Sequence, residues 1–121
     1  MIRLILVAIV LFGFLILGIP LLLIEWVIGK FSQKWKDYSS LRLVQGAFKL
    51  IMFMTGVKLT VIGEENVPKD KAVLYVGNHR SYFDVVMTYA RCPRLTGYVA
   101  KIEMLRYPLL RDWMKNLYCL F

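Results

Sequence analysis

The stretch Leu4–Ile24, LILVAIVLFGFLILGIPLLLI, contains no charged residue. As a helix it would be about 30 Å long, which matches the thickness of the apolar core of a bilayer. A cleavable signal peptide has a shorter apolar region, of roughly 7 to 15 residues, and a small-residue cleavage site. Neither feature is evident here. We therefore expect a retained membrane helix as the first element of the fold.

The charges around this stretch indicate its orientation. Only Arg3 precedes it, whereas five basic residues follow within the next part of the chain: Lys30, Lys34, Lys36, Arg42 and Lys49. By the positive-inside rule, the rest of the chain should face the cytoplasm. The formal net charge is +8. Because the basic residues begin beside the apolar stretch and alternate with aliphatic side chains, we expect membrane phosphates and anionic substrates as partners, and not nucleic acid.

A second helix is predicted over Ser40–Thr55, SLRLVQGAFKLIMFMT. Arg42, Gln45 and Lys49 recur at spacings of three and four, so they form one polar stripe on an otherwise apolar helix. Such a helix can lie at a membrane surface with its basic groups among the headgroups. A core helix with one solvated edge is the alternative. Residues 1–56 are thus predicted to be a membrane anchor helix plus an amphipathic helix, joined by a polar link over residues 29–40.

Residues 57–121 predict a different organisation, the beginning of an α/β sheet domain. Apolar or β-branched runs bounded by turn residues indicate strands, and longer periodic segments indicate helices. The expected strands are Val57–Ile62, Ala72–Val76 and Tyr98–Ala100; the expected helices are Tyr82–Ala90, a short turn over Ile102–Arg106, and Pro108–Asn116. A strand, helix, strand order implies a parallel pair. The predicted fold class is therefore α/β, with N-terminal membrane-associated helices before the first half of a sheet domain.

The predicted topology marks out one rim of the sheet. His79 follows the strand Ala72–Val76, and Lys101 follows Tyr98–Ala100. The carboxyl ends of parallel strands meet at one edge, where α/β folds bind ligands. His79 and Lys101 should therefore lie near each other, at a rim suited to anions.

His79 and Asp84 are five residues apart and could not touch on one continuous helix. They can meet only if His79 lies in a loop and Asp84 lies in the first turn of the next helix. Asp84 would then orient the imidazole, which would act as a general base. Alternatively, Ser81 and Asp84 form a capping box with no chemical role, or the loop binds a ligand without chemistry. Spacing alone leaves the three interpretations open.

Cysteine and histidine usage argues against a metal site. The chain has one histidine and two widely separated cysteines, Cys92 and Cys119. This pattern indicates neither a zinc site nor a disulfide framework, and it fits a reducing compartment.

Two blocks of the sequence resemble a known family. NHRSYFD, residues 78–84, is similar to the NHxSxxD block of the glycerophospholipid acyltransferases. The segment from Lys101 resembles their K-x-E-L-x-x-x-P block, with Lys101, Glu103 and Pro108 as matches. The order and spacing of the blocks most closely resemble those of bacterial-type 1-acyl-sn-glycerol-3-phosphate acyltransferases.

This resemblance implies acyl transfer from a coenzyme A or acyl carrier protein thioester to the free hydroxyl of lysophosphatidic acid, giving phosphatidic acid. His79 would deprotonate the hydroxyl and Asp84 would orient the imidazole. Asn78 and Ser81 would shape the substrate-binding loop, and Lys101 would neutralise the substrate phosphate. The thioester is a co-substrate, and the resemblance implies no cofactor, metal or acyl-enzyme. The active domain would lie at the cytoplasmic face of a membrane.

The chain also departs from the family pattern. Arg111 stands where members often have glycine, and the aspartate-arginine pair and the E-G-T-R block that usually follow are absent. The sequence ends in an apolar run, LYCLF, which would begin a buried strand. We therefore expect the chain to be the N-terminal part of a longer reading frame, with little or no acyl transfer by itself. Two alternatives are a non-catalytic, membrane-anchored module that binds lipid or acyl chains and a basic membrane-surface protein that binds nucleic acid.

Overall fold

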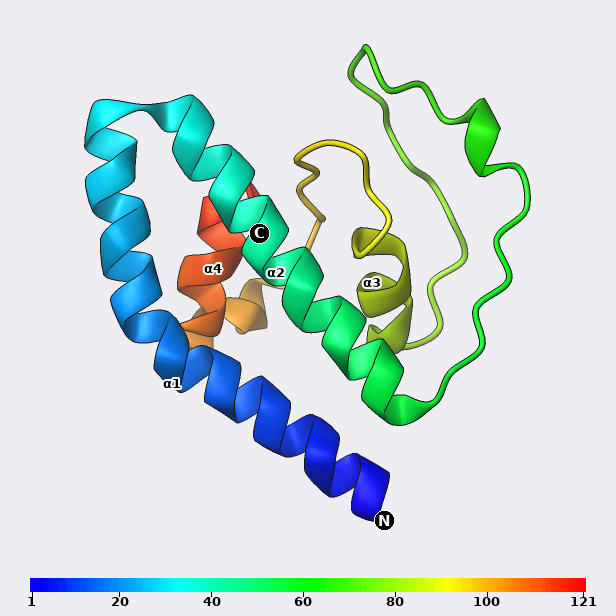
Figure 1. The fold of residues 1–121 in the computed structure, drawn as a ribbon. Coiled ribbons are helices and arrows are strands. Elements are labelled where there is room, and N and C mark those ends of the chain that lie inside the picture. Colours follow the sequence, from blue (N-terminus) through cyan, green and yellow to red (C-terminus); the bar gives the residue numbers. More distant parts are fainter.

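The computed structural model describes residues 1–121 and consists of helices and irregular chain (Figure 1). It contains four α-helices, α1 (Ile2–Phe31), α2 (Gln33–Thr55), α3 (Tyr82–Tyr89) and α4 (Leu110–Asn116), and two short 3-10 helices, η1 (Glu64–Asn66) and η2 (Ile102–Arg106). No β-strand is present. The predicted α/β fold is therefore wrong for this structure.

Two of the three segments predicted as strands lack a paired neighbour, and the third, Tyr98–Ala100, forms only one bridge. No backbone hydrogen bond pairs Val57–Ile62 or Ala72–Val76 with another segment, and both lie in the long loop outside α3 in Figure 1. The only β pairing is an isolated parallel bridge between Val99 and Leu120. A β-branched composition suits a sheet but does not supply the adjacent chain that completes its hydrogen bonds. Leu74 and Val76, which are 86% and 88% exposed, consequently have no covering layer.

Helices α1 and α2 form an antiparallel hairpin. Ser32 ends α1 by donating its N–H to the Ile28 carbonyl at 2.8 Å, and its Oγ accepts from the Trp35 N–H at 3.4 Å to begin α2. At the other end of the hairpin, Arg3 Nη1 donates to the Thr55 carbonyl at 3.3 Å. The predicted polar link over residues 29–40 is therefore helical apart from Ser32, whose extended backbone changes the direction of the chain and whose side chain caps α2.

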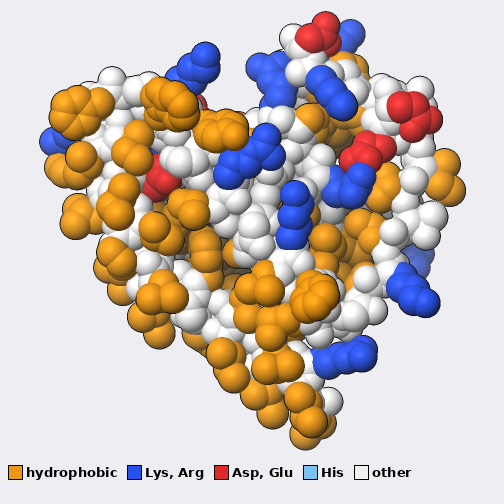
Figure 2. Space-filling view, viewed as in Figure 1, with side chains coloured by type: hydrophobic (Ala, Val, Ile, Leu, Met, Phe, Trp, Pro, Cys, Tyr) orange, Lys and Arg blue, Asp and Glu red, His pale blue; other side chains and the backbone are white.

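Helix α1 has two different faces. One packs against the rest of the protein and includes the buried Gly18 and Glu25; the Glu25 carboxylate accepts from Ser39 Oγ at 2.7 Å. The opposite face is an apolar stripe of side chains that are each more than half exposed: Ile5, Ile9, Phe12, Ile16, Ile19 and Leu23. Figure 2 shows hydrophobic side chains gathered over α1, along the left and lower edge, and most of the basic side chains toward the top and right. Helix α1 is the one helix long and apolar enough to cross a membrane.

The small core lies between the hairpin and the C-terminal half of the chain. It consists of Leu41, Val44, Tyr89, Cys92, Trp113 and Leu117. Helix α4 lies between α1 and α2 in Figure 1, and its Trp113 packs against Gly18 of α1 so closely that a Cβ at position 18 would lie 2.8 Å from Trp113 Nε1. A glycine in α1 therefore allows α4 to approach.

Gln45 corrects the predicted polar stripe of α2. Its side chain is buried, and its Nε2 donates to the carbonyls of Tyr89 at 3.1 Å and Cys92 at 2.7 Å. Arg42 and Lys49 are exposed as expected. Periodicity placed the three residues on one face, but it could not show that the end of α3 covers the middle of that face. Gln45 therefore joins α2 to α3 and is not available to headgroups.

The short C-terminal elements agree with the sequence pattern except at one boundary. Helix α3 and the turn η2 form where they were predicted. Helix α4 begins at Leu110 and not at Pro108, because Leu109 adopts a positive φ of 68° and the Leu110 N–H bonds to the Pro108 carbonyl at 2.8 Å. Gly97 is needed for close packing, since a Cβ there would lie 2.1 Å from the Tyr118 carbonyl oxygen.

Candidate active site

The candidate site is built at the start of α3. Ser81 is the N-cap residue, and its Oγ accepts from the Phe83 N–H at 3.2 Å. Asp84, at the third helical position, accepts from the Ser81 N–H at 2.9 Å. These bonds satisfy N–H groups that have no partner within the helix. The capping interpretation of Ser81 and Asp84 is thus confirmed as a structural fact.

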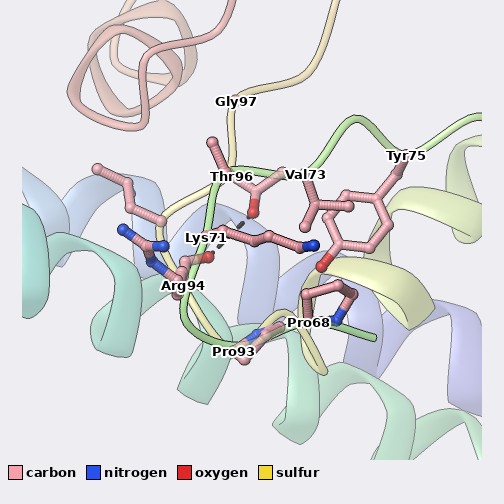
Figure 3. A pocket seen from close by; sticks show the side chains of 10 residues that line it. Pro68, Lys71, Val73, Tyr75, Pro93, Arg94, Thr96 and Gly97 are labelled. Carbon is pink, nitrogen blue, oxygen red and sulfur yellow. Dashed lines mark hydrogen bonds between the residues drawn. The ribbon is translucent and has the colours of Figure 1, made fainter. Parts of the chain in front are cut away.

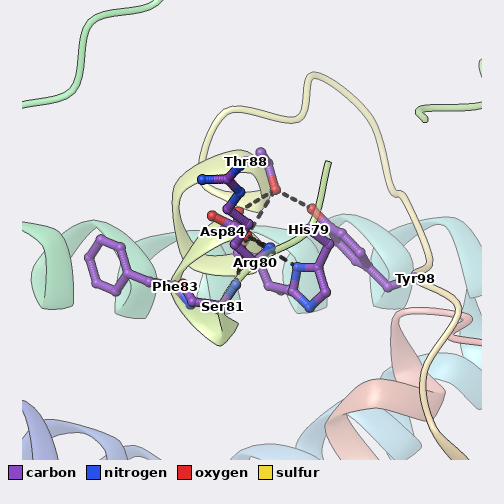
Figure 4. Close-up of polar contacts among 8 residues, drawn as sticks. His79, Arg80, Ser81, Phe83, Asp84, Thr88 and Tyr98 are labelled. Atoms are coloured by element: carbon purple, nitrogen blue, oxygen red, sulfur yellow. Dashed lines mark hydrogen bonds and ion pairs between the residues drawn. The ribbon is translucent and has the colours of Figure 1, made fainter. Parts of the chain in front are cut away.

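The same carboxylate also contacts His79. Asp84 Oδ2 accepts from the Arg80 N–H at 2.7 Å and lies 3.3 Å from His79 Nδ1 (Figure 4). His79 lies in the irregular segment before α3, and its side chain is 61% exposed. Capping and orientation of the imidazole are therefore compatible, because the oxygen that caps the helix also faces the histidine ring.

Asp84 is held in its charged form. The N–H groups of Ser81 and Arg80 lower the pKa of its carboxyl below the ordinary value of 3.8, and His79 lowers this pKa further. An anionic Asp84 beside Nδ1 favours the tautomer that carries its proton on Nδ1. The Nε2 atom of a neutral His79 can then accept a proton from a bound hydroxyl.

Two further residues extend the polar group, and sequence reasoning did not identify them. Thr88 Oγ1 donates to the Asp84 carbonyl at 2.7 Å and lies 2.6 Å from the Tyr98 hydroxyl (Figure 4). Thr88 follows Asp84 by four residues, so helical spacing could have indicated it. Tyr98 gave no such signal. Tyr98 is placed there by packing against Tyr89, with ring centroids 5.7 Å apart. Burial raises the pKa of the Tyr98 phenol, so the hydroxyl stays protonated.

The structure does not gather all of the predicted site residues. His79, Ser81 and Asp84 lie together, whereas Asn78 is exposed and makes no side-chain hydrogen bond. Lys101 lies at the start of η2 and has no hydrogen bond or ion pair with His79 or Asp84. The rim on which Lys101 and His79 were expected to meet does not form, because Ala72–Val76 does not pair with Tyr98–Ala100.

Comparison with known proteins identifies the family. The acyltransferase family model matches residues 58–121, more than half of the chain. The chain belongs to the acyltransferase family. The match covers α3 with its capping residues, η2 and α4, and it leaves out the α1–α2 hairpin.

Two curated relatives resemble this acyltransferase family member. One is the 1-acyl-sn-glycerol-3-phosphate acyltransferase of Borreliella burgdorferi, 32% identical over 71 residues, which are 56% of this chain and 27% of the relative. The other is the probable 1-acyl-sn-glycerol-3-phosphate acyltransferase of Mycoplasma pneumoniae, 38% identical over 77 residues, which are 60% of this chain and 28% of the relative. The matched part therefore spans about a quarter of each relative. No solved structure matches the chain.

Proposed function

We propose that this chain forms part of an enzyme that transfers an acyl group from an acyl-CoA or acyl carrier protein thioester to 1-acyl-glycerol-3-phosphate, forming phosphatidic acid. The contact between His79 and Asp84 is the observation on which the proposal rests. It provides an oriented base that can activate the hydroxyl of the acceptor, so the reaction needs no nucleophilic side chain. The family membership and the printed names of the two relatives support the reaction class and the acceptor.

The proposed step needs one proton carrier. His79 Nε2 takes the proton of the acceptor hydroxyl while its oxygen attacks the thioester carbonyl. The tetrahedral intermediate then expels the thiolate, which receives the proton from the imidazolium, so atoms and charge balance. The Nδ1 to Oδ2 distance of 3.3 Å is longer than a usual hydrogen bond of about 2.9 Å. Contacts of this kind commonly tighten when substrate binds.

We further propose that α1 lies in the membrane interface and does not cross the bilayer. Helix α2 runs beside α1 from Ser32 back to the contact between Arg3 and Thr55. A spanning α1 would draw the charged residues of α2 into the bilayer, at about 2.5 to 3.5 kcal/mol for a charge at the centre. The exposed apolar stripe can instead enter one leaflet. The excess of basic residues after α1 favours contact with the anionic cytoplasmic leaflet, which supports placing the candidate active site at the cytoplasmic face.

The test of the proposed reaction is His79→Ala in a protein that contains this chain and transfers acyl groups measurably. We expect the chemical step to slow on the order of 10² to 10⁴-fold, the usual contribution of positioned proton transfer. Thermal stability should change little because His79 is exposed and fills no core. Glu65→Ala, at an exposed residue outside the site, is the control. Unchanged turnover in His79→Ala would exclude His79 as the base.

A further inference from the structure

One hollow in the structure lies away from the candidate active site. It has a volume of about 230 Å³ and is lined by two segments, Pro68–Tyr75 and Pro93–Gly97. Neither His79 nor Asp84 lines it. Its volume is below the roughly 300 to 1,000 Å³ of pockets for drug-sized ligands, but it exceeds the ≈ 30 Å³ share of one water several times. A small polar ligand suits this size.

Each wall of the hollow provides one cation. Lys71 comes from the first segment and Arg94 from the second. In Figure 3 the Lys71 side chain runs across the hollow toward the Tyr75 ring, and Arg94 lies on the other side. Thr96 Oγ1 donates to the Arg94 carbonyl at 3.0 Å, which stabilises the turn that carries Arg94. The two cations therefore come from segments that are far apart in the sequence.

Protein carboxylates do not neutralise these cations. Neither Lys71 nor Arg94 forms an ion pair. Glu64 is engaged by Arg91 through its two carboxylate oxygens, and no acidic residue lines the hollow. The hollow thus combines two positive charges with no matching negative charge, an arrangement that attracts anions.

The two walls are also not joined by their backbones. No backbone hydrogen bond connects Pro68–Tyr75 with Pro93–Gly97. A doubly charged anion between the two walls would therefore add bonds to both segments.

We propose that the hollow formed by Lys71, Arg94 and Tyr75 binds a phosphate monoester. A monoester carries close to two negative charges at neutral pH, since its second pKa is about 6, and so matches the two cations. The Tyr75 hydroxyl supplies a neutral donor. The phosphate belongs either to a soluble ester or to a lipid headgroup of the monoester type. The site shares no lining residue with the candidate active site and does not depend on the proposed reaction.

Titration of the full chain in detergent micelles with inorganic phosphate tests the site. Amide NMR signals of residues 71–75 and 94–97 should shift together and saturate. We expect Lys71→Gln and Arg94→Gln each to weaken binding roughly 3- to 10-fold, since each removes one charge contact from a hydrated site. Lys69→Gln makes the same change in charge two residues from Lys71, outside the lining, and should stay within about twofold of the unmodified chain.

Vesicles separate the two sources of phosphate. If the ligand is a lipid, Lys71→Gln and Arg94→Gln will weaken binding to phosphatidic acid vesicles more than to phosphatidylglycerol vesicles, because only the former presents a monoester. If it is soluble, glycerol 3-phosphate will bind and the two variants will float with both vesicles as before. Absence of localised shifts, or an equal effect of Lys69→Gln, would overturn the proposal. Neither readout requires turnover, so failure here leaves the proposed acyl transfer untouched.

Discussion

At the residue scale, a single carboxylate oxygen connects helix formation with the candidate chemistry. Asp84 Oδ2 accepts two backbone N–H groups and faces His79 Nδ1. The cap fixes the position of the carboxylate, because the N–H groups belong to the rigid start of α3. The position of the imidazole then follows from the carboxylate. A residue that stabilises the helix is thereby able to orient a base.

Asp84→Asn separates the two roles of Asp84. Asparagine keeps a side-chain oxygen that can accept the Ser81 and Arg80 N–H groups, and losing an exposed charge in the first helical turn costs little, so thermal stability should change little. An amide can hold the imidazole in the wrong tautomer, and we therefore expect turnover to fall about 10²- to 10⁴-fold. Assays of acyl transfer measure the change in turnover, and thermal unfolding measures the change in stability. Ser81→Ala is the counterpart, since it removes a capping oxygen and leaves the His79 contact. If Asp84→Asn keeps most of its activity, Asp84 serves only to cap the helix.

At the element scale, the helices are joined by a few specific contacts and by little buried surface. Gln45 fastens α2 to the end of α3, and Gly18 fits α1 against α4. Only 12 of 121 residues are buried, so each of these contacts supports a large part of the arrangement. Substitutions at these positions should therefore have clear effects on stability.

Gln45→Leu keeps the volume of the side chain and removes its hydrogen bonds. The carbonyls of Tyr89 and Cys92 would lose a buried donor, and we expect a stability loss of about 1 to 3 kcal/mol. Denaturant unfolding in mild detergent gives the value. Lys49→Leu, one turn further along α2 and exposed, should change stability by about 0.5 kcal/mol or less. Equal stability of Gln45→Leu and the unmodified chain would show that these hydrogen bonds contribute nothing.

Gly18→Ala tests the contact between α1 and α4. The new Cβ would meet the buried Trp113 ring at 2.8 Å, and overpacking costs about 1 to 3 kcal/mol. Gly13→Ala adds the same methyl group in the same helix with no atom within 4 Å, so it should be neutral or stabilise by up to ~1 kcal/mol. The difference in melting temperature between the two variants is the measurement. Similar melting temperatures would mean that α4 does not pack on Gly18.

At the scale of the whole molecule, the distribution of side chains explains the proposed membrane contact. The apolar stripe of α1 forms one side of the protein, and basic side chains gather elsewhere (Figure 2). Helix α2 lies beside α1 and carries charged residues, so an orientation along the surface keeps these charges in water while the apolar side chains of α1 enter one leaflet.

Thiol labelling distinguishes an interfacial hairpin from a spanning helix. Arg3→Cys and Lys34→Cys would be prepared with both natural cysteines replaced by serine and added to preformed vesicles. Position 3 lies at the start of α1, and position 34 lies just after the other end of α1, at the start of α2. An interfacial hairpin should therefore leave both positions accessible to a reagent that cannot cross the membrane. Labelling in detergent gives the full reaction for comparison. Protection of one end alone would show that α1 spans the bilayer.

The sequence by itself determined the local features of this protein. The apolar run produced α1, the spacing of Ser81 and Asp84 produced the cap of α3, and the five-residue separation required His79 to lie outside that helix. These features depend on interactions within one or two turns of chain, so the residue pattern contains them. The roles of His79, Asp84, Asn78, Ser81 and Lys101 in a reaction remain proposals.

Only the tertiary structure decided which segments became neighbours. It buried Gln45 under α3, brought Tyr98 to Thr88, and left Val57–Ile62 and Ala72–Val76 unpaired where a sheet was expected. A strand, a buried amide and a cross-chain hydroxyl contact each need a partner that is distant in sequence. Periodicity and composition describe what one segment can offer, whereas pairing depends on where the other segment lies.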